Sequence, residues 1–272
     1  MEITMRHILL YLSVKYAGDF NSMYDAIKRK ELIDKDDVEK VLKSVKSKYI
    51  TLLDKEYPLS LKHIGTPPLV LYYYGDIKLL NNPNIIAIIG ARKCSEYGKE
   101  MTKRIVAGLT KYEATILSGG ALGIDGIAHT IALENHQKTI LVSASGIDNP
   151  YPKTHTELYE RIKKEGLIIS EYPGMIEPQP TFFLIRNRII AALSERIVVT
   201  EAKVRSGTIN TVAYGLEFGK DICCVPSNAN LNSGCNMLIK QGAKLIEKAN
   251  DIYADYWWKQ KKRNSTIEAF NV

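Results

Sequence analysis

From residue 84 onward, short apolar runs rich in β-branched residues alternate with segments of helical length. The six runs are NIIAIIG (84–90), ATILSGG (114–120), KTILVSAS (138–145), GLIISEY (166–172), RIVVTEA (196–202) and DICCVPS (221–227). The helix-length segments lie near 97–112, 123–135, 153–165, 182–194, 206–219 and 232–241. Runs that are apolar throughout are typical of strands covered on both faces. The pattern therefore predicts an α/β fold with a doubly wound, mostly parallel sheet.

The loops that follow these strands are expected to lie along one edge of the sheet. Right-handed crossovers bring the carboxyl ends of parallel strands to the same edge, where open α/β sheets bind ligands. The loops are rich in glycine, serine, asparagine and arginine, and poor in histidine. This composition favours anion binding over acid–base catalysis, so we predict neither a catalytic residue nor a metal site.

The segment SGGALGID, after the second run, is the first candidate for an anion-binding loop. Ser118, Gly119, Gly120, Gly123 and Asp125 belong to it. The glycines allow positive φ angles and close backbone approach, and the N-terminus of the next helix attracts anions. The alternative is a tight turn in which small residues serve only packing. A dinucleotide fingerprint would need glycine at Ser118 and an acidic residue about 20 residues further on, and neither is present.

Three further loops contain candidate phosphate ligands. They are Gly90, Arg92 and Lys93 after the first run, Arg186, Asn187 and Arg188 at a helix start, and Ser206, Gly207 and Thr208 at another. Arg92 and Lys93 can also be ordinary surface charges, although arginine binds phosphate through two parallel hydrogen bonds. Arg186 and Arg188 lie on one helix and cannot both face the protein core, so we expect at least one of them to be available at the loop edge.

Two kinds of residue near these loops are interpreted as structural. Phe182 and Phe183 precede the arginines and are expected to pack, with base stacking as the less favoured alternative. His129 has no serine or cysteine nucleophile at a recognisable spacing, so we assign it a packing role.

The bulk properties limit the function classes. The 272 residues can form one α/β domain and a smaller unit, with 45% hydrophobic and 25% charged residues. The net charge of +7 and a pI near 9.0 favour a polyanionic partner. No apolar stretch reaches the roughly 18–20 residues of a membrane span, and the N-terminal charges argue against a secretory signal. Four cysteines without CxxC spacing indicate reduced thiols. We therefore expect a cytoplasmic protein.

Several segments together resemble the bacterial DNA-processing protein A family, also called Smf. In order, they are GARKCSEYG, LSGGALGIDGIAHTIAL, IISEYP, FFLIRNRIIAALSERIVVTEAKVRSGTINTVAYGLEFGK and VPSNANLNSGCNMLIKQGA. Arg92 matches the arginine of the family's GSR or GTR motif. Ser118–Gly120, Gly123 and Asp125 match its SGxAxGID loop, and Arg186–Arg188 match its RNR element. The resemblance covers about residues 70 to 250.

The resemblance implies an extended Rossmann-like domain that binds single-stranded DNA, forms a homodimer and loads the RecA recombinase. It also implies a role in DNA processing and natural transformation, without a cofactor or an established reaction. We divide the chain into a small helical module with a connector (1–70), a Rossmann-like DNA-binding domain (71–255) and a basic tail (256–272) that contains Trp257 and Trp258. Glycine and arginine loops without base-edge readers predict little sequence preference.

The chain departs from the family pattern at two points, and two rival functions stay open. Pro180 stands where many members have a lysine, and the chain ends before the small winged-helix-like domain that many members carry. One rival is an enzyme similar to the phosphoribohydrolases, whose PGGxGTxxE motif has a glutamate where this sequence has Thr211. The other is a nucleotide-binding sensor without catalysis.

Overall fold

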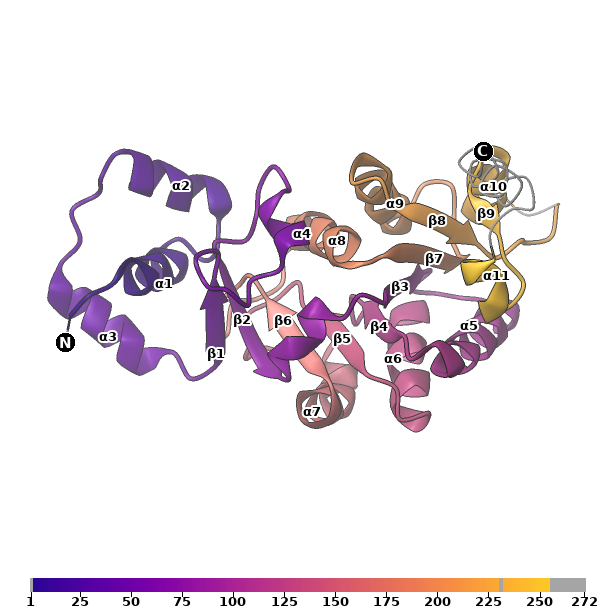
Figure 1. The fold of residues 1–272 in the computed structure, drawn as a ribbon, viewed down its shortest axis with the longest axis horizontal. Helices are drawn as coiled ribbons and strands as arrows, with labels where there is room; N and C mark the ends of the chain where they lie inside the picture. The colour runs from indigo at the N-terminus through magenta and orange to yellow at the C-terminus, as the bar shows by residue number, and fades with distance from the viewer. Residues whose placement is uncertain (1, 230–231, 255–272) are drawn as a thin grey trace, which may run out of the picture.

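The computed structural model describes residues 2–229 and 232–254, which form a mixed sheet covered by helices on both faces (Figure 1). The nine strands within these residues are arranged in the order β1-β2-β6-β5-β4-β3-β7-β8-β9. From β6 to β9 all neighbours are parallel, whereas β2 is antiparallel to both β1 and β6. The tail expected at 256–272, with Trp257 and Trp258, lies outside the described residues.

The strands and helices have the following bounds. The strands are β1 Lys48–Thr51, β2 Val70–Gly75, β3 Ile85–Gly90, β4 Thr115–Ser118, β5 Thr139–Val142, β6 Leu167–Ser170, β7 Arg196–Glu201, β8 Asp221–Cys224 and β9 Lys244–Leu245. The α-helices are α1 Met5–Lys15, α2 Phe20–Lys28, α3 Lys35–Ser44, α4 Leu59–Lys62, α5 Glu96–Leu109, α6 Ile124–Glu134, α7 Thr156–Glu165, α8 Pro180–Leu193, α9 Gly207–Glu217, α10 Gly234–Lys240 and α11 Ala249–Tyr253. Short 3-10 helices occupy Ile77–Asn81, Thr110–Tyr112 and Lys153–His155.

The predicted α/β fold is confirmed, because each of the six apolar runs contains one of the strands β3 to β8. The side chains of β3 show why the centre of each run is apolar at consecutive positions. Ala87 and Ile89 belong to the hydrophobic cluster beneath α4, α8, α9 and α10. Ile86 and Ile88 belong to the cluster beneath α5, α6 and α11. Successive residues of a strand point to opposite faces, so a sheet between two helical layers needs apolar residues at every position.

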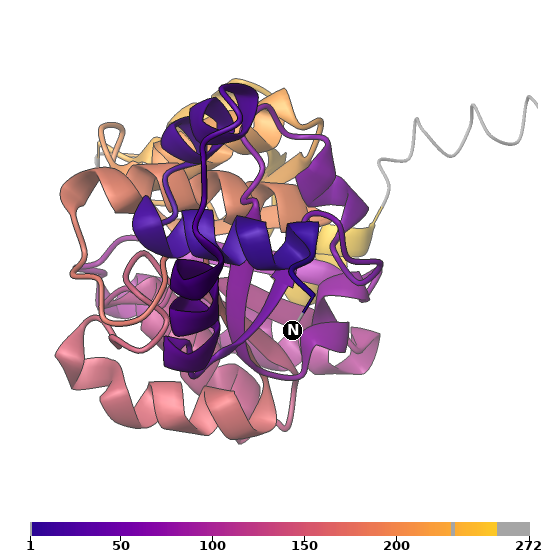
Figure 2. The ribbon, with the colours of Figure 1, turned by 90° about the vertical axis from the view of Figure 1, so that its left-hand side faces the viewer.

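The N-terminal helices α1, α2 and α3 cover the end of the sheet formed by β1 and β2 (Figures 1 and 2). Tyr72 on β2 donates a hydrogen bond to the Ser13 hydroxyl at 2.9 Å. Gly18 has a φ of +78°, and a Cβ atom there would lie 2.3 Å from the carbonyl oxygen of Glu171. The helical module therefore packs tightly against the main sheet.

Strand β1 lies within the segment that the sequence pattern assigned to the helical module and connector. It has only four residues, KYIT, and its partner β2 joins it to the sheet through β6. A strand this short at the sheet edge has no continuous apolar run, so the pattern did not predict it. The division of the chain at residues 70 and 255 stays a prediction. Within the described ranges, no helix is long and apolar enough to cross a membrane.

Candidate nucleic-acid interface

A cavity of about 740 Å³ opens at the carboxyl edge of the sheet, and we call it the edge cavity. It is bounded by the loop after β3, the start of α8 and the loop between β7 and α9. The predicted residues that line it are Gly90, Arg92, Lys93, Asp125, Arg186, Asn187, Ser206, Gly207 and Thr208. Loops from distant parts of the sequence thus converge as the topology predicts. Ser118, Gly119, Gly120, Gly123 and Arg188 are not among its lining residues.

Arg92 and Phe183 form one wall of the edge cavity. The Arg92 side chain is exposed, and its guanidinium carbon lies 4.9 Å from the centroid of the Phe183 ring. Tyr151 meets the same ring edge-on, with the centroids 5.6 Å apart. A guanidinium can bind phosphate oxygens, whereas an aromatic ring offers a stacking surface for a base. This wall can therefore contact both parts of a nucleotide.

Phe182 and Phe183 have different environments although they are adjacent. Phe182 stacks on Tyr172 with the ring centroids 4.1 Å apart, as expected for a packing residue. Phe183 instead lines the edge cavity, where base stacking, the less favoured alternative, stays open. Adjacent residues on a helix point about 100° apart, so two neighbouring aromatics rarely share one environment. This angular separation could have indicated from the sequence that Phe183 does not share the packed environment of Phe182.

The N-terminus of α9 points a second group of polar atoms at the edge cavity. Ser206 is the N-cap residue, and Gly207 and Thr208 form the first turn. The first N–H groups of a helix have no partner within the helix and carry its positive dipole end. Exposed Lys203, in the preceding loop, also lines the cavity. Lys203 was not among the predicted site residues, although its position in the loop before Ser206 could have indicated that it lies beside the predicted site.

The glycine loop between β4 and α6 is closed around a carboxylate of the chain itself. Asp125 accepts hydrogen bonds from the backbone N–H groups of Gly119 at 3.2 Å and Ala121 at 3.4 Å. The Ser118 hydroxyl donates to the carbonyl oxygen of Ile88 at 2.7 Å. Ser118, Gly119 and Gly120 are all buried. Two of the loop's N–H groups therefore have an internal acceptor, which is the geometry of a tight packed turn.

Gly123 connects this loop to the one that bears Arg92. Its φ is +76°, and a Cβ atom there would lie 2.4 Å from the carbonyl oxygens of both Ala91 and Arg92. The N–H group of Ile124 donates to the Ala91 carbonyl at 3.2 Å. The glycine loop thus supports the backbone from which Arg92 extends.

Arg186 lies beneath the edge cavity and is 4% exposed. Its guanidinium donates to the carbonyl oxygen of Gly119 at 2.7 Å and to that of Val142. Burial lowers the pKa of Arg186, and the nearby Asp125 carboxylate opposes this effect. Burial likewise raises the pKa of Asp125, and the Arg186 charge opposes that shift. The two side chains therefore stabilise each other's charged forms while they fix the ends of β4 and β5.

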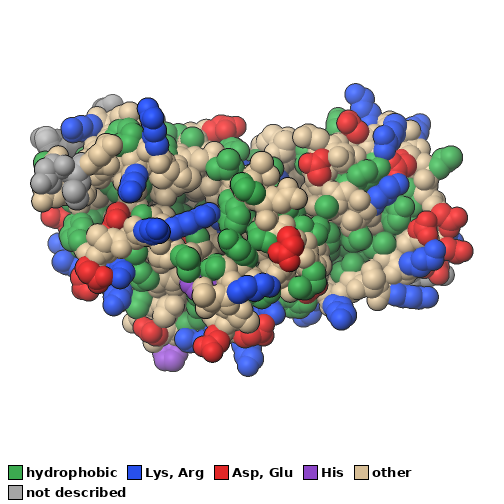
Figure 3. All heavy atoms as spheres, turned by 180° about the vertical axis from the view of Figure 1, so that it is seen from behind, with side chains coloured by type: hydrophobic (Ala, Val, Ile, Leu, Met, Phe, Trp, Pro, Cys, Tyr) green, Lys and Arg blue, Asp and Glu red, His purple; other side chains and the backbone are tan. Residues whose placement is uncertain are grey.

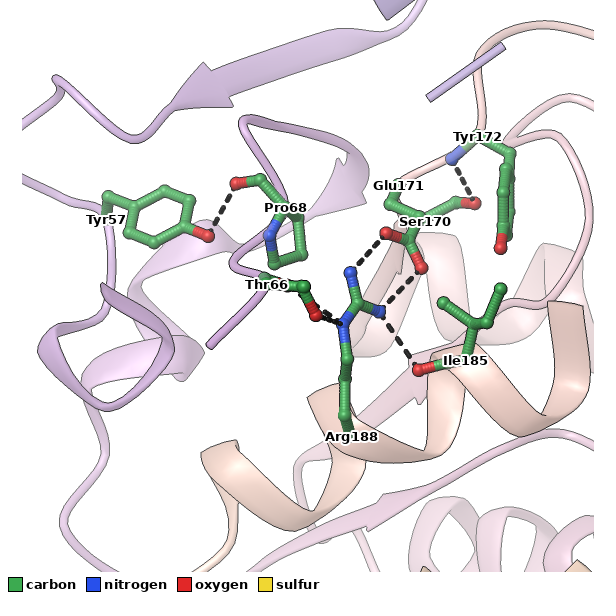
Figure 4. Close-up of polar contacts among 8 residues, drawn as sticks. All are labelled: Tyr57, Thr66, Pro68, Ser170, Glu171, Tyr172, Ile185 and Arg188. Atoms are coloured by element: carbon green, nitrogen blue, oxygen red, sulfur yellow. Dashed lines mark hydrogen bonds and ion pairs between the residues drawn. The ribbon is translucent and has the colours of Figure 1, made fainter. Parts of the chain in front are cut away.

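Arg188 forms a buried ion pair with Glu171 (Figure 4). The two Nη atoms donate to the carboxylate oxygens at 2.8 and 2.6 Å, and Nε donates to the carbonyl oxygen of Thr66 at 2.9 Å. Burial alone would lower the pKa of Arg188, but the charge and hydrogen bonds of Glu171 raise it overall. Arg188 thus joins α8 to the segment before β2 and to the end of β6.

At least one of Arg186 and Arg188 was expected to be available at the loop edge; Arg186 does line the edge cavity, but both side chains are buried. Both side chains are 4% exposed. Each finds buried acceptors supplied by distant segments, namely the carbonyl groups at strand ends for Arg186 and the Glu171 carboxylate for Arg188. Asn187, between them, donates through Nδ2 to the carbonyl oxygen of Gly207 at 3.3 Å. The RNR element therefore holds the surrounding loops in place.

The described residues that line the edge cavity carry more positive than negative charge, with Arg92, Lys93, Arg186 and Lys203 against Asp125. Asp125 is the one carboxylate among its described lining residues, and it is held by backbone N–H groups. Thr211 lines the cavity where the phosphoribohydrolase-like motif would place a glutamate. His129 is fully buried and bonds the Thr139 hydroxyl through Nδ1 at 2.7 Å, and burial lowers its pKa to about 3. It is therefore neutral near pH 7 and packs inside the fold.

Charges of both signs are interspersed on the face opposite to that of Figure 1 (Figure 3). Lysine and arginine side chains alternate there with acidic ones, and hydrophobic side chains gather near the middle of the face. The net charge of +7 is thus not displayed as one uniform basic surface on that side. Among the described residues, no three His, Cys, Asp or Glu side chains are grouped so that they could hold a metal ion.

Comparisons with known proteins agree with the resemblance seen in the sequence. The family model described as DNA recombination-mediator protein A matches residues 48–257. The DNA processing protein DprA of Streptococcus pneumoniae is 39% identical over 208 residues, which cover 76% of this chain and 73% of that protein. The X-ray structure of the S. pneumoniae protein aligns with a TM-score of 0.78 at 34% identity and covers 93% of each chain.

A second solved structure is that of DNA processing protein A from Helicobacter pylori, described for its single-stranded DNA binding mode. It aligns with a TM-score of 0.70 at 34% identity and covers 76% of this chain and 94% of that one. At these identities the likeness extends beyond the fold to the family. The resemblance inferred from the motifs is confirmed.

Proposed function

The chain belongs to the DNA recombination-mediator protein A family, and from that premise we propose that its edge cavity binds single-stranded DNA. The observation that carries the proposal is the Arg92 guanidinium, exposed at the cavity wall and 4.9 Å from the Phe183 ring centroid. Arg92, Lys93 and Lys203 supply positive charge, and the Phe183 ring supplies a stacking surface. The H. pylori relative, described for binding single-stranded DNA, supports the same ligand class.

The predicted site residues take two different roles in this proposal. Arg92, Lys93 and the N-terminus of α9 at Ser206, Gly207 and Thr208 contact phosphates directly. Gly90 lines the same wall, where a Cβ atom would lie 2.6 Å from Ile124 Cγ1. The remaining residues hold these contacts in place from beneath: Ser118, Gly119, Gly120, Gly123, Asp125, Arg186, Asn187 and Arg188.

Binding of this kind has a predictable salt dependence and little sequence preference. Phosphate contacts fix the strand without reading base edges, and stacking accepts any base. If three to five phosphates are neutralised, log affinity falls against log salt with a slope of about −2 to −3.5. A bounded cavity disfavours the wider, stiffer double helix.

We further propose that the protein loads RecA onto the bound strand, acts as a homodimer in the cytoplasm and catalyses no reaction of its own. The description of the matching family as recombination mediators supports the RecA role. The edge cavity supports the absence of catalysis, because its described lining residues offer one carboxylate, Asp125, which is engaged by the glycine loop. No cofactor is needed for this function.

The test is fluorescence anisotropy with a labelled single-stranded oligonucleotide, with duplex DNA and mononucleotides as competitors, over a salt series. We expect salt-sensitive binding that single strands displace and mononucleotides do not. Equal competition by mononucleotides would favour the nucleotide sensor, and turnover of a nucleotide would favour the phosphoribohydrolase-like enzyme. The RecA role is then tested by adding RecA to DNA coated with a single-strand-binding protein and following its ATPase rate with and without this protein.

A further inference from the structure

A second hollow, the α5–α6 groove, adjoins the edge cavity on the other side of the Arg92 loop. Its volume is about 890 Å³, and its lining includes Lys99 and Lys103 from α5 and Thr130 from α6. Arg92 and Lys93 line both hollows. The two hollows are therefore adjacent and share a basic border.

The α5–α6 groove carries more positive than negative charge. Lys99 and Lys103 are one helical turn apart, about 6 Å along α5, and so lie on the same side of the helix. Lys103 is exposed, whereas Lys99 is partly buried and pairs with Glu96, with Nζ and Oε1 2.6 Å apart. Exposed ion pairs of this kind contribute little and exchange readily with another anion. Glu134 is the one carboxylate among the described lining residues.

The α6 side of this groove is lined mainly by small and apolar residues, with the His155 ring packed closely against Gly126. Gly123 and Gly126 contribute no side chains there, and a Cβ atom at Gly126 would lie 2.6 Å from Cε1 of His155. His155 also lines the groove, and its Nδ1 is 3.1 Å from the carbonyl oxygen of Gly120. Ile127 and Ile131 add an apolar surface. A hollow with basic residues on one side and small or apolar residues on the other suits an extended sugar–phosphate backbone.

We propose that the α5–α6 groove binds the continuation of the DNA strand held in the edge cavity. The inference rests on the proposed function, since the same strand occupies both hollows. The strand crosses Arg92 and Lys93 as it leaves the edge cavity, and its next phosphates meet Lys99 and Lys103. The occupant is a polyanion because the groove is basic, and it is the same strand because the two hollows share two cationic residues.

Two measurable properties follow from a strand that fills both hollows. Affinity increases with oligonucleotide length until the strand spans both. Two additional phosphate contacts steepen the salt slope by about 1.4, at about 0.7 per contact for single strands. If the strand is confined to the edge cavity, Lys99 and Lys103 contribute neither to the increase of affinity with oligonucleotide length nor to the salt slope.

The test compares the wild-type chain with a Lys99→Gln, Lys103→Gln double variant. Binding is measured by anisotropy with single-stranded oligonucleotides of about 4 to 16 nucleotides, the usual range of site sizes. The matched control is Lys43→Gln with Lys46→Gln, which removes the same charge from exposed residues of α3 and the segment after it, at the opposite end of the molecule (Figure 1). Circular dichroism and thermal unfolding serve to check that each variant folds.

We expect the double variant to bind the shortest oligonucleotides as the wild type does and to lose about 10-fold in affinity for the longest, with a shallower salt slope. An unchanged affinity at every length overturns the inference, and so does an equal loss at every length. Wild-type protein that binds no single strand at any length contradicts the proposed function itself, and the inference falls with it. Short-strand binding that persists in the double variant separates the two claims.

Discussion

The loops after β3 and β4 are neighbours at the same edge of the sheet, yet only one of them presents an exposed cation. The loop after β4 contains Gly119, Gly120 and Gly123, and the loop after β3 directly follows Gly90; both segments resemble anion-binding turns in sequence. In the loop after β4, Asp125 accepts the N–H groups of Gly119 and Ala121. In the loop after β3, the Arg92 side chain is exposed over Phe183. Glycine spacing therefore predicts the shape of a loop, whereas ligand contact depends on which polar groups lack an internal partner.

The arginines show the same contrast. Arg92 is exposed at the wall of the edge cavity, whereas Arg186 and Arg188 are buried and bonded to carbonyl and carboxylate oxygens of the chain. Three arginines that fit one motif-based hypothesis thus have two different roles. Arg92 is available to bind, and the other two stabilise the surface around it. The variants below separate these roles.

The largest expected effect comes from Arg188→Met. Removing one partner of a buried ion pair leaves Glu171 uncompensated, so we expect the free energy of unfolding to fall by about 3–5 kcal/mol. Urea denaturation measures this loss, and Arg188→Met combined with Glu171→Leu is expected to recover part of it. A variant with wild-type stability and weakened DNA binding would assign Arg188 to the binding surface together with Arg92.

Arg92→Ala is expected to reverse that pattern. The loss of charged hydrogen bonds to phosphate costs about 1.5–3 kcal/mol of binding, which corresponds to roughly 10- to 150-fold in affinity. Stability changes little because the side chain is exposed. Anisotropy and thermal unfolding give the two readouts, with Arg92→Lys as the control that keeps the charge but loses the planar fork. Full affinity in Arg92→Ala would remove Arg92 from the site.

Phe183→Leu tests whether the two adjacent aromatics have different roles. Loss of a stacking surface is expected to weaken single-strand binding by about 1–3 kcal/mol without a change in the salt slope, because no charge is removed. Phe182→Leu serves as the control, since that ring stacks on Tyr172 and its loss is expected to lower stability instead. Equal effects of the two substitutions on affinity would mean that Phe183 has no special role.

The smallest effect is expected far from the edge cavity, at Glu31 in the helical module. Lys15, Tyr16 and Arg29 donate hydrogen bonds to its carboxylate and lower its pKa from 4.5 to about 2. Because the pKa is lower in the folded chain, this stabilisation is present above pH 4.5 and is lost as the pH falls towards 2. Unfolding measured between pH 5 and about 2 is expected to depend less on pH in Glu31→Gln.

DNA affinity at neutral pH is expected to stay at the wild-type level in Glu31→Gln, because the residue lies in the helical module. A DNA-binding defect in this variant would instead link the module to the edge cavity. An unchanged pH dependence of unfolding would show that the Glu31 contacts do not stabilise the folded chain.

The central sheet could be predicted from the sequence because each of its strands from β3 to β8 is marked by the residues of that strand alone. Each run that forms one of the strands β3 to β8 has consecutive apolar residues at its centre, and segments of helical length separate the runs. Strand β1, with the sequence KYIT, escaped prediction because it has no continuous apolar run, and its place depends on β2 pairing with distant β6.

The convergence of the loops at the candidate site was predicted only as far as the topology of the sheet determines it. The strand order brings the loops after the parallel strands to one edge of the sheet, and Arg92, in the loop after β3, lies at that edge. The burial of Arg186 and Arg188 depends on acceptors contributed by Gly119, Val142 and Glu171, which lie far from them in sequence. Helical periodicity alone cannot reveal such partners, because it describes where a side chain points and not what it meets there.

The most direct test of the central claim compares the salt dependence of single-strand binding in the wild type and in Arg92→Ala. If Arg92 binds a phosphate in the edge cavity, the slope of log affinity against log salt becomes shallower by about 0.7 for each phosphate that the variant no longer neutralises. Parallel lines, with the same slope in both proteins, would contradict the assignment of the edge cavity as the DNA-binding site.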